Sequence, residues 1–296
     1  MSTFAGVNAT FRCRRRGVGV RNVRLVRQFC QLIHAELTKI RTVRSTRMAL
    51  LFALLICVGL GYGISLSLRV GFARLPPRQR RDFDPLFATF YGVGVGQLAV
   101  VVFGATMVGS EFGSGTIAMS LTAVPRRGLF YAAKITAGLL AAAVTALVTV
   151  PAEFFAAQRA LGPHATSAGA PGTLQAAAGA CLYLTLICAL AMGVAATTRS
   201  TTGVAVTTRS TARALVVMLP LLFLDSQGLG NVPGLQRVVD YLPDQAGAVI
   251  MHLSAPGDGR FARPFGPWTG MGIMLAWVAA VLAGGYLMLA RTDVTR

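Results

Sequence analysis

The chain has 296 residues, of which 54% are hydrophobic and only 13% charged, and its mean hydropathy is +0.62. Soluble domains carry about 25% charged residues, so this deficit, together with long uncharged runs, excludes an ordinary soluble domain and indicates a multi-span membrane protein. The formal net charge of +18 would suggest nucleic-acid binding in a soluble protein, but here the basic residues flank apolar runs, so we expect a lipid bilayer and no nucleic acid as partner.

The first 46 residues precede the first long apolar run. Residues 1–21 are basic, with no acidic residue before Glu36, and we expect a disordered tail; an organelle transit peptide and an overextended start are the alternatives. Residues 22–46 carry apolar side chains at spacings of three and four, namely Val26, Phe29, Ile33, Leu37 and Ile40. This period predicts an amphipathic helix in the membrane interface, with its arginines reaching lipid headgroups.

Six later segments are read as membrane spans. A helix rises about 1.5 Å per residue, so about 20 apolar residues cross a hydrocarbon core of about 30 Å. The expected spans are residues 48–68, 90–108, 129–150, 174–196, 206–226 and 268–290. The predicted fold is therefore an all-α membrane protein, in which residues 47–296 form a six-helix transmembrane domain preceded by the amphipathic interfacial helix.

The fifth of these spans is irregular. The sequence TTRST occurs at 197–201 and again at 207–211, and only the eleven residues Ala214–Leu224 then lack charge. Eleven helical residues reach about 17 Å, roughly half the core. The span must therefore include Arg209 and Arg213, or Asp225 and beyond, or be incomplete; we favour the first, with both arginines snorkelling to the cytoplasmic boundary. After it, an amphipathic piece at 236–253 is expected on the outer surface or dipping into the membrane.

Six spans place both chain ends on the same side. With the N-terminus inside, 19 of the 28 lysine and arginine residues fall on the inner side. Because basic residues are enriched in cytoplasmic loops, this asymmetry favours an N-in, C-in topology.

Motifs for catalysis are missing. No GxxxxGK[ST] phosphate-binding loop occurs around the two lysines, Lys39 and Lys134, and the histidines His34, His164 and His252 lie outside the spans without an HExxH motif. The five cysteines form no CxxC pair. We therefore expect no enzymatic activity and no cofactor on this chain.

Other polar and small residues receive structural interpretations. Glu153 and Asp225 are expected to be solvated carboxylates near helix ends, rather than members of a proton relay. The pairs Gly92–Gly96 and Gly59–Gly63 have the spacing that allows close helix packing.

The stretch 108–134 is too polar for a span and joins the second and third spans. Gly113 and Gly115 permit a tight turn out of the second span, and Ser114 or Thr116 can cap a short helix that reaches about Ala123. Pro125 would end that helix. Arg126 and Arg127 would then meet lipid headgroups or acidic groups on a partner. An ordinary basic loop is the alternative.

Three groups of residues resemble motifs of the membrane subunits of ABC-2 type transporters, the permease half of ATP-driven exporters. Before the first span these are Glu36, Leu37, Lys39, Arg41 and Thr42. Between spans two and three they are Glu111, Gly115, Thr116, Leu121, Pro125, Arg126, Arg127 and Lys134. Around and after span five they are Arg209–Ala212, Leu242, Pro243, Ala246 and Gly247.

The resemblance implies a bacterial cell-membrane permease that works with a second permease subunit and an ABC ATP-binding subunit, which would hold ATP and Mg²⁺. It implies that the loop after span two inserts a coupling helix into the ATPase, with Glu111, Gly115, Thr116, Pro125, Arg126, Arg127 and Lys134 at the coupling surface. Glu36, Lys39 and Arg41 would belong to the interfacial helix. A self-contained secondary transporter or channel, which would need intramembrane carboxylates, is the alternative.

Overall fold

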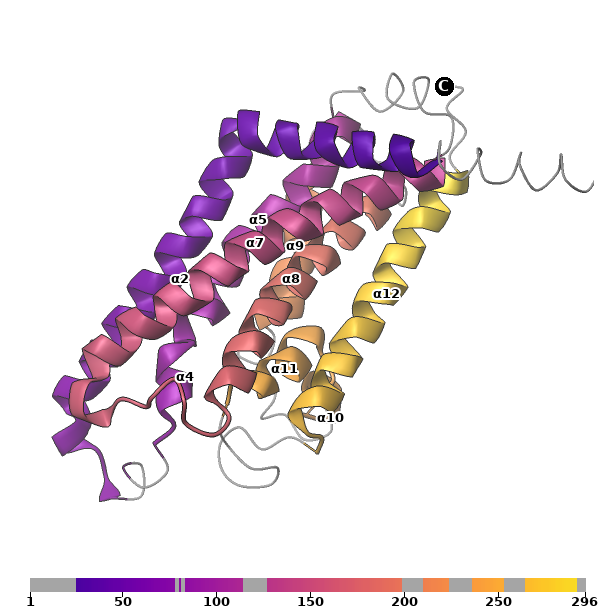
Figure 1. The fold of residues 1–296 in the computed structure, drawn as a ribbon. Coiled ribbons are helices and arrows are strands. Elements are labelled where there is room, and N and C mark those ends of the chain that lie inside the picture. The colour runs from indigo at the N-terminus through magenta and orange to yellow at the C-terminus, as the bar shows by residue number, and fades with distance from the viewer. Residues whose placement is uncertain are drawn as a thin grey trace, which may run out of the picture.

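The computed structural model describes residues 25–77, 80, 83–113, 127–198, 210–223, 236–252 and 264–291. These residues are predominantly helical and contain no strand (Figure 1). Five helices are long and apolar enough to cross a membrane, namely α2 (Arg44–Gly71), α5 (Tyr91–Gly113), α7 (Arg127–Leu161), α8 (Thr173–Thr197) and α12 (Pro267–Arg291). The helical fold with several candidate spans is confirmed; the predicted span at 206–226 is not among the five.

Residues 25–42 form a helix that lies across one end of the bundle, at the end where α12 finishes at Arg291 (Figure 1). We call this the Arg291 end. Glu36 and Ile40 are buried on the inner face of this helix, whereas Val26 is 63% exposed. A helix is therefore present within the predicted range 22–46, but it ends at residue 42 because α2 begins at Arg44, and Val26 does not belong to its buried face. The tail 1–21 lies outside the described residues.

The opposite end of the bundle is called the Asp84 end. Here the 3₁₀ turn η1 (Phe72–Arg74) follows α2, and the short helix α4 (Pro85–Thr89) precedes α5. Asp84 caps α4, because its Oδ1 accepts the Leu86 amide at 2.8 Å. A second 3₁₀ turn, η2 (Gly162–His164), follows α7, and the His164 ring stacks on Phe72 with centroids 3.7 Å apart.

Two helices extend past their predicted ends. α5 continues to Gly113 instead of ending at residue 108, and α7 runs for 35 residues through Pro151 to Leu161. A proline removes one backbone hydrogen bond, but the residues after it are rich in alanine and place Phe154, Ala157 and Leu161 against the bundle. Helix propensity and packing therefore carry α7 beyond the proline.

The described part of the fifth predicted span is α9 (Ser210–Phe223), with Pro220 inside it. Its 14 residues reach about 21 Å, less than the core of a bilayer. Arg213 lies in its first turns and is partly buried. Arg209, Asp225 and most of the TTRST repeat lie outside the described residues.

The predicted amphipathic piece at 236–253 is divided into α10 (Gln236–Asp240), α11 (Pro243–Ala248) and the 3₁₀ turn η4 (Val249–Met251). The helical conformation is interrupted at Leu242, which is extended, because the residue before a proline disfavours the helical conformation. α11 packs mainly on α12, with further contacts to α8 and α9, and most of its residues are buried. These short helices are tucked into the Asp84 end (Figure 1).

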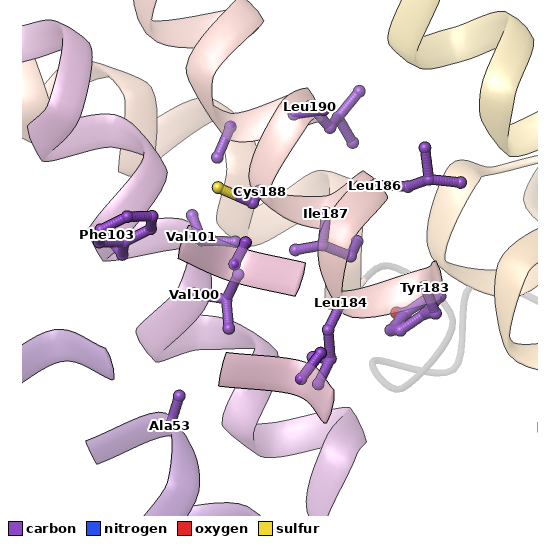
Figure 2. Close-up of a cluster of buried hydrophobic side chains, with 14 of the residues drawn as sticks. Ala53, Val100, Val101, Phe103, Tyr183, Leu184, Leu186, Ile187, Cys188 and Leu190 are labelled. Carbon is purple, nitrogen blue, oxygen red and sulfur yellow. The ribbon is translucent and has the colours of Figure 1, made fainter. Parts of the chain in front are cut away.

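The core lies around α8, the most thoroughly buried of the five long helices. Val100, Val101 and Phe103 of α5 lie beside the segment of α8 from Tyr183 to Leu190 (Figure 2). α2 packs on α5 and α7, and α12 packs on α8. The bundle therefore has α8 inside and α2 and α12 at its outer faces.

The packing of α2 is the reverse of that in a soluble protein. Its buried residues are small or polar and recur every four positions, namely Ala49, Ala53, Cys57, Gly61 and Ser65. On its outer face, about half of the surface of Leu51, Phe52 and Leu55 is exposed. Small residues between helices and large apolar residues outside are typical of a helix packed within lipid.

The two predicted glycine pairs have different outcomes. Gly92 and Gly96 of α5 both lie against Cys57 of α2, so this pair does permit close helix packing. At Gly59 and Gly63 no atom lies within 4 Å of the position that a Cβ would occupy. Within the described part of the chain this pair therefore makes no close helix contact, and Gly61 is the glycine on the buried stripe of α2.

Candidate functional site

An ion-paired junction at the Arg291 end joins residues far apart in the sequence. Lys134 Nζ of α7 donates to Glu36 Oε2 of the helix 25–42 at 2.7 Å, and the side chains are 4% and 6% exposed. Lys39 Nζ donates to the other oxygen, Oε1, at 2.9 Å, and its side chain is half exposed. We call Glu36, Lys39 and Lys134 the Glu36 junction.

The junction also reaches α5. Lys134 Nζ lies 3.4 Å from the backbone carbonyl oxygen of Met107, and 5.6 Å from the centroid of the Phe130 ring. In the sequence, Met107 precedes the stretch 114–126 that joins α5 to α7, and Lys134 follows it. One ammonium group therefore contacts the helix 25–42 and the two spans that flank this stretch.

Local sequence explains why the charges are buried. Glu36 lies one turn before Ile40 on the inner face of its helix, and Lys134 lies on the inner face of α7 with Phe130 one turn before it. Removing a charge from water costs several kcal/mol unless an opposite charge and hydrogen bonds compensate it. The partners therefore require each other, which fixes the helix 25–42 against α7.

Arg127 joins two helix ends at the same side of the bundle. Its Nη1 donates to the carbonyl oxygens of Leu289 and Ala290, each at 3.2 Å. The last carbonyls of a helix lack intrahelical partners and carry a partial negative charge, so a cation stabilises them. Arg127 thus caps α12, and its contact with headgroups or a partner stays a prediction.

Replacing Arg127 with glutamine should lower the free energy of unfolding by about 1–2 kcal/mol, because two charge-assisted hydrogen bonds to the end of α12 are lost. Thermal unfolding of the detergent-solubilised protein measures this change. The control is Arg47→Gln, an exposed arginine of α2 whose loss should cost less than about 0.5 kcal/mol. Equal melting temperatures for the two variants would contradict the capping contact.

The structure brings together only part of the predicted coupling surface. Lys134 is within the Glu36 junction and Arg127 is on α12, whereas Arg41 is exposed on the helix 25–42. The expected coupling helix from Ser114 or Thr116 to Ala123 lies outside the described residues. Gly115, Thr116, Pro125 and Arg126 also lie outside the described residues. Glu111 lies in α5, but its side chain is not described.

Glu153 is buried in the bundle, so the expectation of a solvated carboxylate is wrong. Its side chain is 0% exposed, and neither carboxyl oxygen has a hydrogen-bond partner among the described residues. It lies in α7 two residues after Pro151, where the helix was expected to have ended. Continuation of α7 carries Glu153 into the contact with α2 and α5.

A second buried polar group lies on the central helix. The Tyr183 hydroxyl of α8 donates to Gln97 Oε1 of α5 at 2.6 Å, and the Gln97 amide donates to the Gly94 carbonyl at 2.8 Å. Buried Asp244 of α11 interacts electrostatically with Tyr183. These residues were not predicted from the sequence, although uncharged polar residues inside apolar spans are the signal that could have indicated them.

No group of three histidine, cysteine, aspartate or glutamate side chains in the described part of the chain is arranged to hold a metal ion. The polar features on which the functional argument rests are the Glu36 junction, the cap of α12 and buried Glu153. No family model matches the sequence, and no curated protein is significantly similar to it.

Proposed function

We propose that the chain is the transmembrane permease subunit of a bacterial ABC exporter, oriented N-in and C-in. It would work with a second permease subunit and an ATP-binding subunit to export a substrate across the cell membrane. The observation that carries the proposal is the Glu36 junction, because its residues belong to the motifs that resemble ABC-2 permeases and connect the three helices around the stretch between α5 and α7.

The junction supports a mechanical route. A partner that pushes on the stretch 114–126 moves the ends of α5 and α7 to which it is joined. Lys134 then transmits the motion to the helix 25–42 through Glu36, and Arg127 transmits it to α12. Packed helices change by rigid-body shifts rather than by continuous deformation. ATP and Mg²⁺ would be bound by the partner, since this sequence contains no phosphate-binding loop.

Purification from its native host tests the proposal. The affinity-tagged chain should bring down an ATP-binding subunit and vanadate-sensitive ATP hydrolysis. Arg126→Glu, in the stretch between α5 and α7, should reduce both, whereas Arg74→Glu at the exposed Asp84 end should leave both unchanged. Failure to capture an ATPase with no nucleotide, with ATP and after vanadate trapping would contradict the proposal.

Glu153 favours a second candidate, a self-contained secondary transporter. Such proteins place carboxylates within the membrane to couple ion movement to transport, and Glu153 is fully buried between candidate spans. Purified chain in liposomes that contain no ATPase distinguishes the candidates. A proton or sodium gradient should drive uptake of an amphiphilic dye if the second candidate is correct, and should have no effect if transport requires the ATP-binding subunit.

A further inference from the structure

Glu153 of α7 lies where its helix meets α2 and α5, close to the turn between α4 and α5. Val93, at the start of α5, donates its amide to the Phe90 carbonyl at 3.1 Å, which makes a tight turn between α4 and α5. The amides of Gly92 and Val93 face the carboxyl group and favour its charged form, although neither reaches the geometry of a full hydrogen bond with it. The carboxyl therefore points at the first turn of α5 without being satisfied there.

Two glycines make room for this carboxyl. A Cβ added at Gly61 of α2 would lie 3.0 Å from Glu153 Oε1 and 2.9 Å from the Thr89 carbonyl oxygen. A Cβ added at Gly92 of α5 would lie 2.5 Å from Glu153 Oε1 and would overlap the Cys57 carbonyl. The two backbone carbonyl oxygens and Oε1 therefore border the same small space.

The surroundings contain no compensating charge. Among the described residues, no lysine, arginine or histidine forms an ion pair with Glu153. The titratable group that faces it from α2 is the Cys57 thiol, and α4 and α5 contribute Thr89, Gly92 and Val93, which carry no charge. An unpaired carboxylate in such a place costs many kcal/mol, whereas a neutral carboxylic acid can donate to a carbonyl oxygen.

We propose that Glu153 is a reversible proton-binding site that controls the contact of α7 with α2 and α5. With the proton on a carboxyl oxygen, the acid donates a hydrogen bond to the Thr89 or Cys57 carbonyl, and the three helices pack as observed. When the proton leaves to water, the remaining charge must be hydrated, and the helices separate around it. The site belongs to this chain alone and does not depend on an ATP-binding partner.

Infrared spectroscopy of the purified wild-type chain tests the proton directly. At neutral pH the spectrum should contain the carbonyl stretch of a protonated carboxylic acid, and this band should disappear as the pH is raised. The band should be absent from Glu153→Gln and retained in Glu36→Gln, which removes a carboxylate that is ion-paired. A wild-type spectrum without the band, or a band unchanged by Glu153→Gln, would overturn the proposal.

Accessibility of Cys57 tests the separation of the helices. Cys57 is 0% exposed and packs against Gly92 and Gly96 of α5 near Glu153, so a thiol reagent can reach it only when α2 separates from its neighbours. The experiment uses the chain with Cys57 as its single cysteine, labelled between about pH 5 and pH 9. Glu153→Gln in the same background corrects for the pH dependence of the thiol, because a glutamine cannot lose a proton.

The ratio of the two labelling rates gives the outcome. It should be near one at low pH and rise by up to about tenfold per pH unit once the carboxyl loses its proton. A ratio that stays constant over the whole range overturns the proposal. Both experiments use the chain without any ATPase, so their failure is distinguishable from failure of the proposed exporter function.

Discussion

Replacing Glu36 with leucine should lower the free energy of unfolding by about 3–5 kcal/mol. The substitution removes the carboxylate that pairs with Lys134 at 2.7 Å, and the Lys134 side chain is 4% exposed, so a buried ammonium group loses an ion pair. The apolar side chain itself fits a helix face that already carries Ile40. The loss therefore measures the buried charge rather than poor packing.

Replacing Lys134 with methionine should cost less, about 1–3 kcal/mol, because Glu36 keeps its bond to Lys39 at 2.9 Å. The double variant Glu36→Leu/Lys134→Met buries no charge and should be more stable than the sum of the single losses predicts. Denaturant unfolding in detergent micelles gives the free energies of unfolding of the wild type, the two single variants and the double variant, which together form a double-mutant cycle.

Lys39→Met is the matched control for the Glu36 junction. The Lys39 side chain is half exposed and also pairs with Glu36, so its removal should cost less than about 1 kcal/mol. If Glu36→Leu costs no more than Lys39→Met, the contact between Glu36 and Lys134 does not hold the helix 25–42 to α7.

Gly92→Ala should destabilise the protein by about 1–3 kcal/mol, because the added methyl group has no space. Its Cβ would overlap the backbone carbonyl of Cys57 and lie 2.5 Å from Glu153 Oε1, so α2, α5 and α7 must shift apart. Thermal unfolding and the labelling rate of Cys57 should both report the shift.

Gly94→Ala provides a control two residues away on the same helix. No atom lies within 4 Å of the position that its Cβ would occupy. Alanine has the higher helix propensity, so this variant should be unchanged or more stable by about 0.5–1 kcal/mol. Equal effects at the two glycines would show that helix propensity, rather than the close approach of α2 and α5, governs this region.

Helix positions were predictable because they depend on local composition. Long uncharged runs located α2, α8 and α12 to within a few residues, since a span needs a minimum length of apolar chain. The ends of α5 and α7 were not predictable in the same way. Pro151 indicates an end by local rules, but contacts made by Phe154, Ala157 and Leu161 with the bundle allow α7 to continue.

In the candidate site, too, the residues could be predicted from the sequence but their contacts could not. Glu36, Lys39, Arg127 and Lys134 could be singled out by their residue types and spacing near the ends of apolar runs. Their contacts could not be predicted, because Glu36 and Lys134 are separated by 98 positions and meet only when the helix 25–42 folds across the end of α7. The cap that Arg127 provides for α12 depends on two carbonyl groups that follow it by 162 and 163 positions.

The sequence by itself determined that this protein is helical, apolar and without a phosphate-binding loop, because these properties follow from composition and short motifs. Only the tertiary structure decided that α2 packs through small residues, that Lys134 is paired with Glu36, and that Glu153 is buried without a partner. Burial and pairing depend on which helices become neighbours, and that choice is made by packing among residues far apart in the chain.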